Sequence, residues 1–234
     1  MGRPFTLASW NLFQGLHHST RRTAQVDNDK VPRHLQSLDA DVLVLPEAWR
    51  YQNVHATWAE DIAEQLGYDL HQWISDSPSR ARDTVPWRMV MLTRIPARAV
   101  APQVMSSYGS FGPRAIVRVE LAESGLTIAA AHLYGIHLLA QRQPRNWMNE
   151  RAALRLASRT NDVIAGDLNM WGPVVRRDTS PMTPAAKGRT FPSPRPHSQI
   201  DHVLVNSRVR VLDSEVLPDM GSDHRAIRTT LQAR

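Results

Sequence analysis

Short apolar segments bounded by turn residues dominate the chain, and they restrict its possible folds more than any other feature. Nine of them have the length of a β-strand, and few helix-like segments separate them. They are residues 6–12, 41–45, 89–93, 115–121, 126–133, 162–165, 199–205, 209–217 and 226–231. Glu123-Ser124-Gly125 predicts a hairpin turn between two of them. So many strands favour two sheets packed face to face with helices outside, rather than a simple alternating β-α-β fold.

Helical signals are fewer. Residues 57–66 begin with the capping-box pattern Thr57-x-x-Glu60 and end at Gly67, and residues 147–159 carry an apolar stripe at helical spacing. A weaker helix is predicted over 31–38. Residues 75–86 and 176–196 are rich in Pro, Ser, Arg and Asp, and predict long loops. The 234 residues show no repeat and no linker-like change of composition, so we expect one domain spanning 1–234.

The chain is basic. It has 28 Lys and Arg against 22 Asp and Glu, a net charge of +6 and a pI near 10.4, and its only lysines are Lys30 and Lys187. A positive surface favours a polyanionic partner such as nucleic acid or anionic lipid headgroups. Genome base composition explains the excess of arginine over lysine equally well, so that ratio by itself says little. The net charge still shapes the field around the protein.

Several function classes are excluded by what the sequence lacks. Without cysteine there are no disulfides, no thiolate catalysis and no cysteine-type zinc site. No apolar run approaches the ~20 residues that span a bilayer. The first residues lack the apolar core and cleavage site of a signal peptide. We therefore expect a cytoplasmic protein without a membrane span, and a monomer.

Polar side chains recur where the predicted strands begin or end. They are Asn11, Glu47, His132, Asp167, Asn169, Asp201, Asp223 and His224. A strand end fixes a side chain yet leaves it open to solvent, so residues from several strands can converge on one pocket. Hard cations such as Mg²⁺ prefer oxygen ligands, usually one or two carboxylates with water and substrate phosphate. Asp167 and Asn169, two residues apart, lie on one side of an extended chain.

Each of these residues has an ordinary structural explanation when taken alone. Asp-x-Asn after a glycine is more often a turn than a pair of ligands, and an isolated Asp-His is usually a surface pair. His132 alone fits a buried core histidine. The ordered set, rather than any single residue, indicates a site.

That set resembles the endonuclease/exonuclease/phosphatase superfamily, which includes pancreatic-type deoxyribonucleases, abasic-site endonucleases, sphingomyelinases and inositol-polyphosphate phosphatases. The matching stretches are Ser9-Trp10-Asn11, Leu45-Pro46-Glu47, Ala131-His132-Leu133, Gly166-Asp167-Leu168-Asn169, Gln199-Ile200-Asp201-His202 and Ser222-Asp223-His224-Arg225. They cover nearly the whole chain. The resemblance implies a four-layer α/β sandwich, with two packed mixed β-sheets flanked by helices, and a site for Mg²⁺ or Mn²⁺.

The resemblance also implies roles around the metal and the phosphate. Asn11 and Glu47 would lie at the metal, with Glu47 as a direct ligand, and Asp223 would face it. Asp167 and Asn169 would flank the attacking water and the phosphate.

Two histidines complete the implied site. His224 would be the general base, held by Asp201, and its unperturbed pKa of ~6.5 suits that role. Asp167 is the rival base. His132 would lie against the phosphate or the leaving oxygen, where an imidazolium and a cation stabilise the charge of a phosphoryl group in transfer.

This sequence departs from the superfamily pattern in three places. An acidic residue common in the nucleases is replaced by Phe13, and the glutamine before the metal glutamate by Pro46. A Gly-Asn pair near the start of one strand is replaced by Arg88-Met89, so a phosphate-contacting amide is missing and Arg88 is a candidate replacement. These changes affect the choice of substrate.

Two further residues are candidates for substrate binding. Arg114, at the start of a strand, can reach a phosphate, or it is a solvated strand end. Phe191, in a basic loop, can stack on a base, or it anchors the loop on the core. His17-His18 resembles a metal pair but has no partner at ligand spacing.

The sequence therefore predicts a divalent-metal-dependent phosphoesterase that hydrolyses phosphodiester bonds, with nucleic acid as the leading substrate. A lipid or inositol-phosphate esterase of the same chemistry is the alternative. The alternative from another class is an inactive nucleic-acid-binding module, which should have lost Asp167, Asn169, Asp201 or His224.

Overall fold

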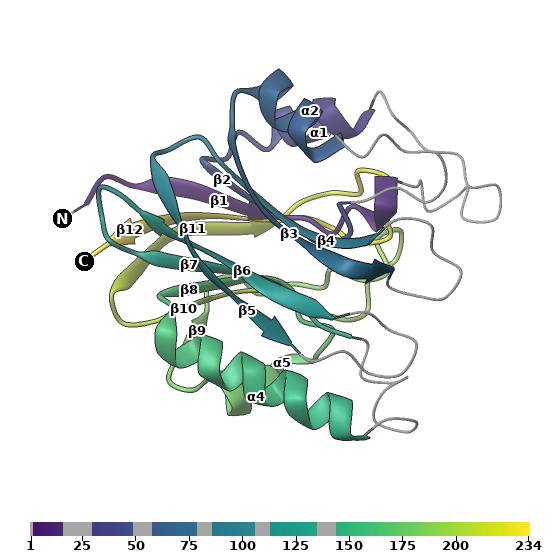
Figure 1. Ribbon diagram of the computed structural model, residues 1–234, viewed down its shortest axis with the longest axis vertical. Helices are drawn as coiled ribbons and strands as arrows, with labels where there is room; N and C mark the ends of the chain where they lie inside the picture. Colours follow the sequence, from purple (N-terminus) through teal and green to yellow (C-terminus); the bar gives the residue numbers. More distant parts are fainter. Residues whose placement is uncertain (1, 16–29, 49–57, 79–85, 106–112, 135–143) are drawn as a thin grey trace.

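Two β-sheets pack face to face, with helices on both outer sides, in the computed structural model of the protein (Figure 1). The structure describes residues 2–15, 30–48, 58–78, 86–105, 113–134 and 144–234. These residues form twelve strands, four α-helices and one short 3-10 helix, Phe13–Gly15. The four-layer α/β sandwich implied by the sequence is thus confirmed.

Each sheet has six strands and is mixed, because one pair of strands in each is parallel. The first sheet has the order β11-β12-β1-β2-β4-β3, with β1 parallel to β2. Its strands are β1 (Phe5–Ser9), β2 (Val42–Leu45), β3 (Asp69–Pro78), β4 (Pro86–Thr93), β11 (Val209–Val216) and β12 (Ile227–Ala233). The second has the order β5-β6-β7-β8-β10-β9, with β7 parallel to β8. Its strands are β5 (Ala97–Met105), β6 (Arg114–Leu121), β7 (Thr127–His132), β8 (Val163–Asp167), β9 (Thr183–Pro184) and β10 (Asp201–Val205).

Alternation along the strands divides the apolar residues among three core clusters. In β4, Trp87, Met89 and Met91 point into the core between the sheets, whereas Val90 and Leu92 point to the outer face. Helices α1 (Lys30–Ser37) and α2 (Trp58–Leu66) cover the outer face of the first sheet, and α4 (Pro144–Thr160) and α5 (Gly172–Thr179) cover that of the second. Burying each of these large apolar side chains contributes about 1.5–3 kcal/mol.

Strands β3, β5 and β9, which the sequence did not predict, all lie at sheet edges. An edge strand has fewer neighbours to pack against. β5 accordingly exposes most of its residues and lacks an apolar run. The predicted loop 75–86 is wrong where β3 extends to Pro78 and β4 starts at Pro86. The predicted loop 176–196 is wrong where α5 extends to Thr179 and β9 pairs with β10.

The three predicted helices are present, with boundaries shifted by at most three residues. Thr57 of the predicted capping box lies outside the described residues, as does the His17-His18 pair. Within the described ranges, no helix is long and apolar enough to cross a membrane.

Candidate active site

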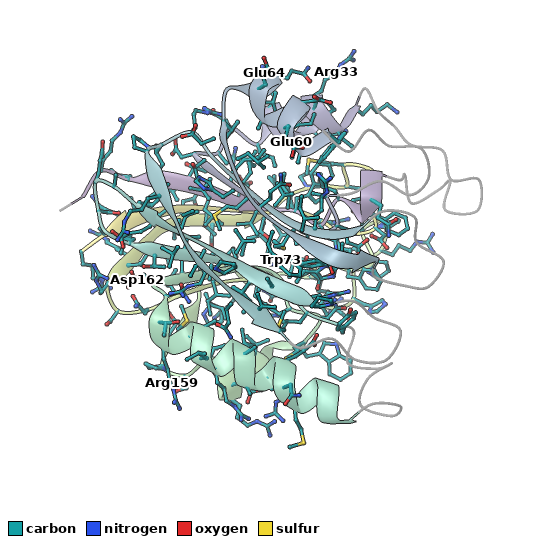
Figure 2. All side chains as sticks on the ribbon, viewed as in Figure 1. Arg33, Glu60, Glu64, Trp73, Arg159 and Asp162 are labelled. Carbon is teal, nitrogen blue, oxygen red and sulfur yellow. The ribbon has the colours of Figure 1, made fainter. Side chains whose placement is uncertain are left out.

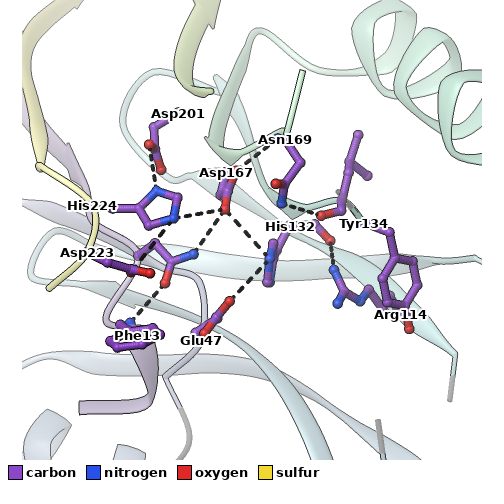
Figure 3. Close-up of polar contacts among 12 residues, drawn as sticks. Phe13, Glu47, Arg114, His132, Tyr134, Asp167, Asn169, Asp201, Asp223 and His224 are labelled. Carbon is purple, nitrogen blue, oxygen red and sulfur yellow. Dashed lines mark hydrogen bonds and ion pairs between the residues drawn. The ribbon is translucent and has the colours of Figure 1, made fainter. Parts of the chain in front are cut away.

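The predicted polar residues meet at one end of the sandwich, and Figure 3 shows how most of them face one another. Asn11 follows β1, Glu47 follows β2, and His132 and Asp167 are the last residues of the parallel pair β7 and β8. Parallel strands bring their carboxyl ends to the same edge of a sheet, and the two sheets pack with these edges together. Asp201 opens β10 directly opposite Asp167, because those two strands are antiparallel.

The backbone at this end adopts conformations that few residues tolerate. Gly166 has φ 140°, and a Cβ atom there would lie 1.8 Å from the carbonyl oxygen of Ala131. Glycine is therefore required where β8 approaches β7, one residue before Asp167. Glu47 and Asn169 have φ 53° and 50°, in the left-handed region. Such backbone strain is concentrated at functional sites, where the surrounding structure must hold it.

His224 forms a buried pair with Asp201. Its Nδ1 lies 2.9 Å from Asp201 Oδ2, and its Nε2 lies 3.7 Å from Asp167 Oδ2 and 3.9 Å from Asp223 Oδ1. Trp10 Nε1 donates to the His224 carbonyl oxygen at 3.1 Å and fixes the backbone. Burial opposes a charge on His224, but the carboxylates of Asp201, Asp167 and Asp223 outweigh it and raise its pKa to about 10. In the absence of a cation, these carboxylates thus favour the imidazolium form of His224.

Asp167 lies at the centre of the cluster. Asn11 Nδ2 donates to its Oδ2 at 3.0 Å, and the Asn169 backbone N–H donates to its Oδ1 at 2.8 Å. Burial raises its pKa to about 7, although His224 nearby favours the charged form. The Asn11 amide oxygen accepts from the Phe13 N–H, and Asn169 Nδ2 donates to the Leu133 carbonyl oxygen. Both asparagines therefore orient Asp167 and the chain around it.

His132 faces the same space from β7. Its Nε2 lies 3.8 Å from both Glu47 Oε1 and Asp167 Oδ2, and its ring stacks against that of Trp87, with centroids 6.1 Å apart. Burial, with the positive charges of Arg114 and His224, holds the pKa of His132 well below its usual value. Without a cation or a phosphate at the site, these effects favour the neutral ring over the imidazolium that the resemblance implies.

The oxygen atoms around this space suit a divalent cation. Among the described residues, the only basic side chains within 4 Å of the Glu47 and Asp167 carboxylates are those of His132 and His224. Ligand atoms of Asp167, Asp201 and His224 also lie within 4.8 Å of one another. Since Asp201 and His224 are already bonded together, Asp167, Glu47 and Asp223 are the better candidates to hold a cation, as hard cations prefer carboxylates.

Of the three predicted substrate-binding residues, Arg114 and Phe191 lie at the cluster. Arg114 Nη1 donates to the His132 carbonyl oxygen at 3.2 Å, and the Phe191 ring lies 4.8 Å from that of His224. Phe191 thus packs on a site residue while remaining partly exposed. Arg88 lies elsewhere: it follows the inward-pointing Trp87, on the face of β4 toward α2, and its guanidinium is 3.6 Å from the Glu60 carboxylate.

Sequence reasoning missed two residues behind Arg114. Its guanidinium carbon lies 3.4 Å from the centre of the Tyr134 ring, a close cation–π contact. The Tyr134 backbone N–H donates to both carboxylate oxygens of Glu150 on α4, at 3.1 and 3.0 Å. Burial raises the pKa of Glu150 to about 7, although Arg114 and the Tyr134 N–H favour its charged form. Glu150 is the only acidic residue in the sequence of α4, and this isolated carboxylate is the feature of the sequence from which its role could have been predicted.

The fold and site together define a two-sheet α/β sandwich of the class whose members generally hydrolyse phosphoester bonds with a divalent metal. A model of the endonuclease/exonuclease/phosphatase family matches residues 8–224, and the chain belongs to this family. No protein with a curated description matches the sequence significantly.

Solved structures share the fold at low sequence identity. An endonuclease/exonuclease/phosphatase from Beutenbergia cavernae DSM 12333 is 20% identical, with 99% of this chain and 72% of that one covered and a TM-score of 0.72. The human Nocturnin catalytic domain with bound sulfate is 14% identical over 100% and 96% of the chains, with a TM-score of 0.67. D. rerio TDP2 complexed with single-strand DNA product is 14% identical over 98% and 99%, with a TM-score of 0.61.

Proposed function

We propose that the protein hydrolyses phosphodiester bonds in nucleic acid by attack of water on phosphorus, with Mg²⁺ or Mn²⁺ bound at the site. The observation that carries this proposal is the His224–Asp201 pair facing the buried Asp167 carboxylate, at a strand end that also presents Glu47 and His132. We further propose that the whole chain acts as one domain and as a monomer.

The residues present fit a divalent cation, because Glu47 and Asp167 direct carboxylate oxygens at the same nitrogen of His132 from 3.8 Å, too far for hydrogen bonds. A cation held by Glu47, Asp167 and Asp223 would neutralise charge on the phosphate and make a bound water more acidic.

Side chains of the protein itself would accept the proton of the attacking water. Asp201 fixes the tautomer of His224 and stabilises its charge, as the acid does in any Asp–His pair. Asp167 and His224 Nε2 lie 3.7 Å apart and titrate as a pair. His224 Nε2, with Asp167 as the rival, would accept the proton of the attacking water, because a cation held by Asp167 and Asp223 would weaken the countercharges that keep His224 protonated. Neutral His132 can donate a hydrogen bond from Nε2 to a phosphate or leaving oxygen. Arg114 adds positive charge beside it.

Nucleic acid is the leading substrate for two reasons. The net charge of +6 favours a polyanion, and D. rerio TDP2, which shares the fold, has been crystallised with a single-strand DNA product. A lipid or inositol-phosphate ester fits the same chemistry and charge. An inactive binding module fits less well, because Asp167, Asp201 and His224 are all present and buried, and His224 is hydrogen-bonded to Asp201.

A substrate screen tests this proposal. The purified protein with Mg²⁺ is offered plasmid DNA, RNA, bis(p-nitrophenyl) phosphate, an inositol phosphate and a phosphomonoester, with Asp167→Asn as the matched inactive control. Cleavage of DNA or RNA that Asp167→Asn lacks supports the proposal. Turnover of only the lipid-type or monoester substrates would replace nucleic acid as the substrate, and no turnover of any would favour a binding module.

A further inference from the structure

The outer surface of α4 and α5 carries positive charge alone. We define the α4–α5 face by five arginines of these helices: the exposed Arg155, Arg159, Arg176 and Arg177, and Arg151, whose side chain is only 11% exposed. The sequences of both helices contain only two acidic residues, Glu150 and Asp178, and both are 3% exposed. The face is therefore basic because its acidic residues are buried.

Three of these arginines converge on one carboxylate. Asp178 accepts hydrogen bonds from Arg151 and from Arg155 Nη2, the latter at 2.9 Å, and Arg177 Nε lies 3.8 Å from it. One negative charge thus holds three positive charges together, which leaves an excess of positive charge on this surface. The Arg155 and Arg177 side chains are 47% and 62% exposed. Fixed and partly exposed guanidinium groups suit phosphate, which they can bind through two parallel hydrogen bonds.

The face starts at the candidate active site. Trp171, the residue before α5, comes two residues after Asn169, so the two Cα atoms are at most about 7 Å apart. Its side chain is 56% exposed. Figure 1 shows α4 starting at the end of the second sheet where β7 and β8 end, and running back along the sheet.

From there the arginines extend away from the site. Arg151, Arg155 and Arg159 recur every four residues, so they lie along one side of α4, over roughly 12 Å. Figure 2 shows Arg159 projecting outward from α4. An aromatic side chain beside the reacting centre, followed by a row of cations, matches how single-stranded nucleic acid is held: bases stack and phosphates pair with a basic groove.

We propose that the α4–α5 face, with Trp171, binds the phosphate backbone of a nucleic acid strand that extends from the active site. The inference rests on the proposed function. A membrane surface fits less well, because only two large apolar residues of the described part of α4, Met148 and Leu156, are exposed, and the residue between them on that side is the small Ala152.

The test measures binding of a fluorescent single-stranded oligonucleotide of roughly 12 nucleotides, a length within the usual range for such sites. Fluorescence anisotropy is recorded in excess EDTA, so that cleavage does not interfere. The test variant is Arg155→Gln/Arg159→Gln/Arg176→Gln. The control variant, Arg3→Gln/Arg98→Gln/Arg210→Gln, removes the same charge from exposed positions on other elements.

The test variant should bind at least about tenfold more weakly, and the slope of log affinity against log salt should decrease by about 2, since each lost phosphate contact contributes about 0.7. The affinity of the control variant for the oligonucleotide should fall by less than about threefold. Trp171→Ala should also weaken binding about tenfold, as expected for loss of one stacked base. Both the test variant and Trp171→Ala should hydrolyse bis(p-nitrophenyl) phosphate at the wild-type rate, which separates this surface from the catalytic groups.

Three results would overturn the inference. One is an equal loss of oligonucleotide affinity in the test and control variants, which would show that binding depends on net charge rather than on this face. Another is wild-type protein that does not bind the oligonucleotide. The third is binding to phosphatidylserine vesicles that the test variant loses while oligonucleotide binding stays intact, which would make the face a membrane surface. If the protein cleaves no substrate at all, the proposed function fails, whereas the anisotropy result still decides this inference.

Discussion

His224 Nδ1 lies 2.9 Å from Asp201 Oδ2, although the two residues are 23 positions apart in the chain. Both side chains are almost fully buried. This contact fixes the ring of His224 so that its other nitrogen points toward Asp167 and Asp223. The chemistry proposed for the site depends on that orientation.

Removing either partner of this pair should abolish most of the activity. We expect His224→Ala to lower turnover by about 10²–10⁴ and Asp201→Asn by a similar factor, since the imidazole then loses its countercharge or its tautomer. The double variant should be little worse than either single one, because groups that act as a unit give non-additive losses. Steady-state kinetics on the best substrate measures this. Near-normal turnover in His224→Ala, with Asp167→Asn inactive, would assign proton acceptance to Asp167 alone.

His202, next to Asp201 in sequence, provides the control. Its Nε2 lies 2.8 Å from the Met170 carbonyl oxygen, on the other side of β10 from Asp201. His202→Ala should reduce the free energy of unfolding by about 1–3 kcal/mol, the cost of leaving a buried acceptor unpaired, and turnover should fall less than about tenfold. Chemical denaturation and kinetics on the same sample separate these effects. A loss of turnover like that of His224→Ala, at unchanged stability, would contradict this assignment.

Activity should require a divalent cation. A chelator should abolish turnover, and Mg²⁺ or Mn²⁺ should restore it. Zn²⁺ is not expected to be the native ion, because the chain has no cysteine. Glu47→Gln removes one of few carboxylates, so half-maximal activity should need about tenfold more Mg²⁺, equivalent to about 1.4 kcal/mol. Glu60→Gln, an exposed carboxylate on α2, is the matched control. Full turnover in excess chelator would rule out metal dependence.

Glu150 should make stability depend on pH. Burial raises its pKa from 4.5 to about 7 in the folded protein. Between these values the folded state keeps a proton that the unfolded state has lost, so stability falls as pH rises through this window. Glu150→Gln keeps an acceptor for the Tyr134 N–H but cannot ionise. Its stability relative to wild type should therefore increase from pH 4.5 to pH 7.5, by on the order of 3 kcal/mol. Thermal or urea unfolding across that range measures the difference, and a constant difference would show that Glu150 ionises normally.

Much of the fold follows from local sequence. Val42–Leu45 is apolar at every position and becomes a central strand buried on both faces. Edge strands such as β5 have a different origin. Its exposed residues carry no apolar pattern, and it exists because β6 offers free backbone hydrogen-bonding groups along its whole length. Backbone pairing with β6, the next strand along the chain, requires no apolar pattern in β5 itself, so periodicity could not predict this strand.

The site divides in the same way. The sequence by itself determined which groups are present: Gly166 before Asp167, the order of the polar residues at strand ends, and the absence of thiols. Only the tertiary structure decided their electrostatic state. Without a cation at the site, burial and Arg114 favour the neutral form of His132, whereas Asp201 and Asp167 favour the charged form of His224. Burial and charge fields depend on distance in space, and the spacing of residues along a chain does not contain that distance.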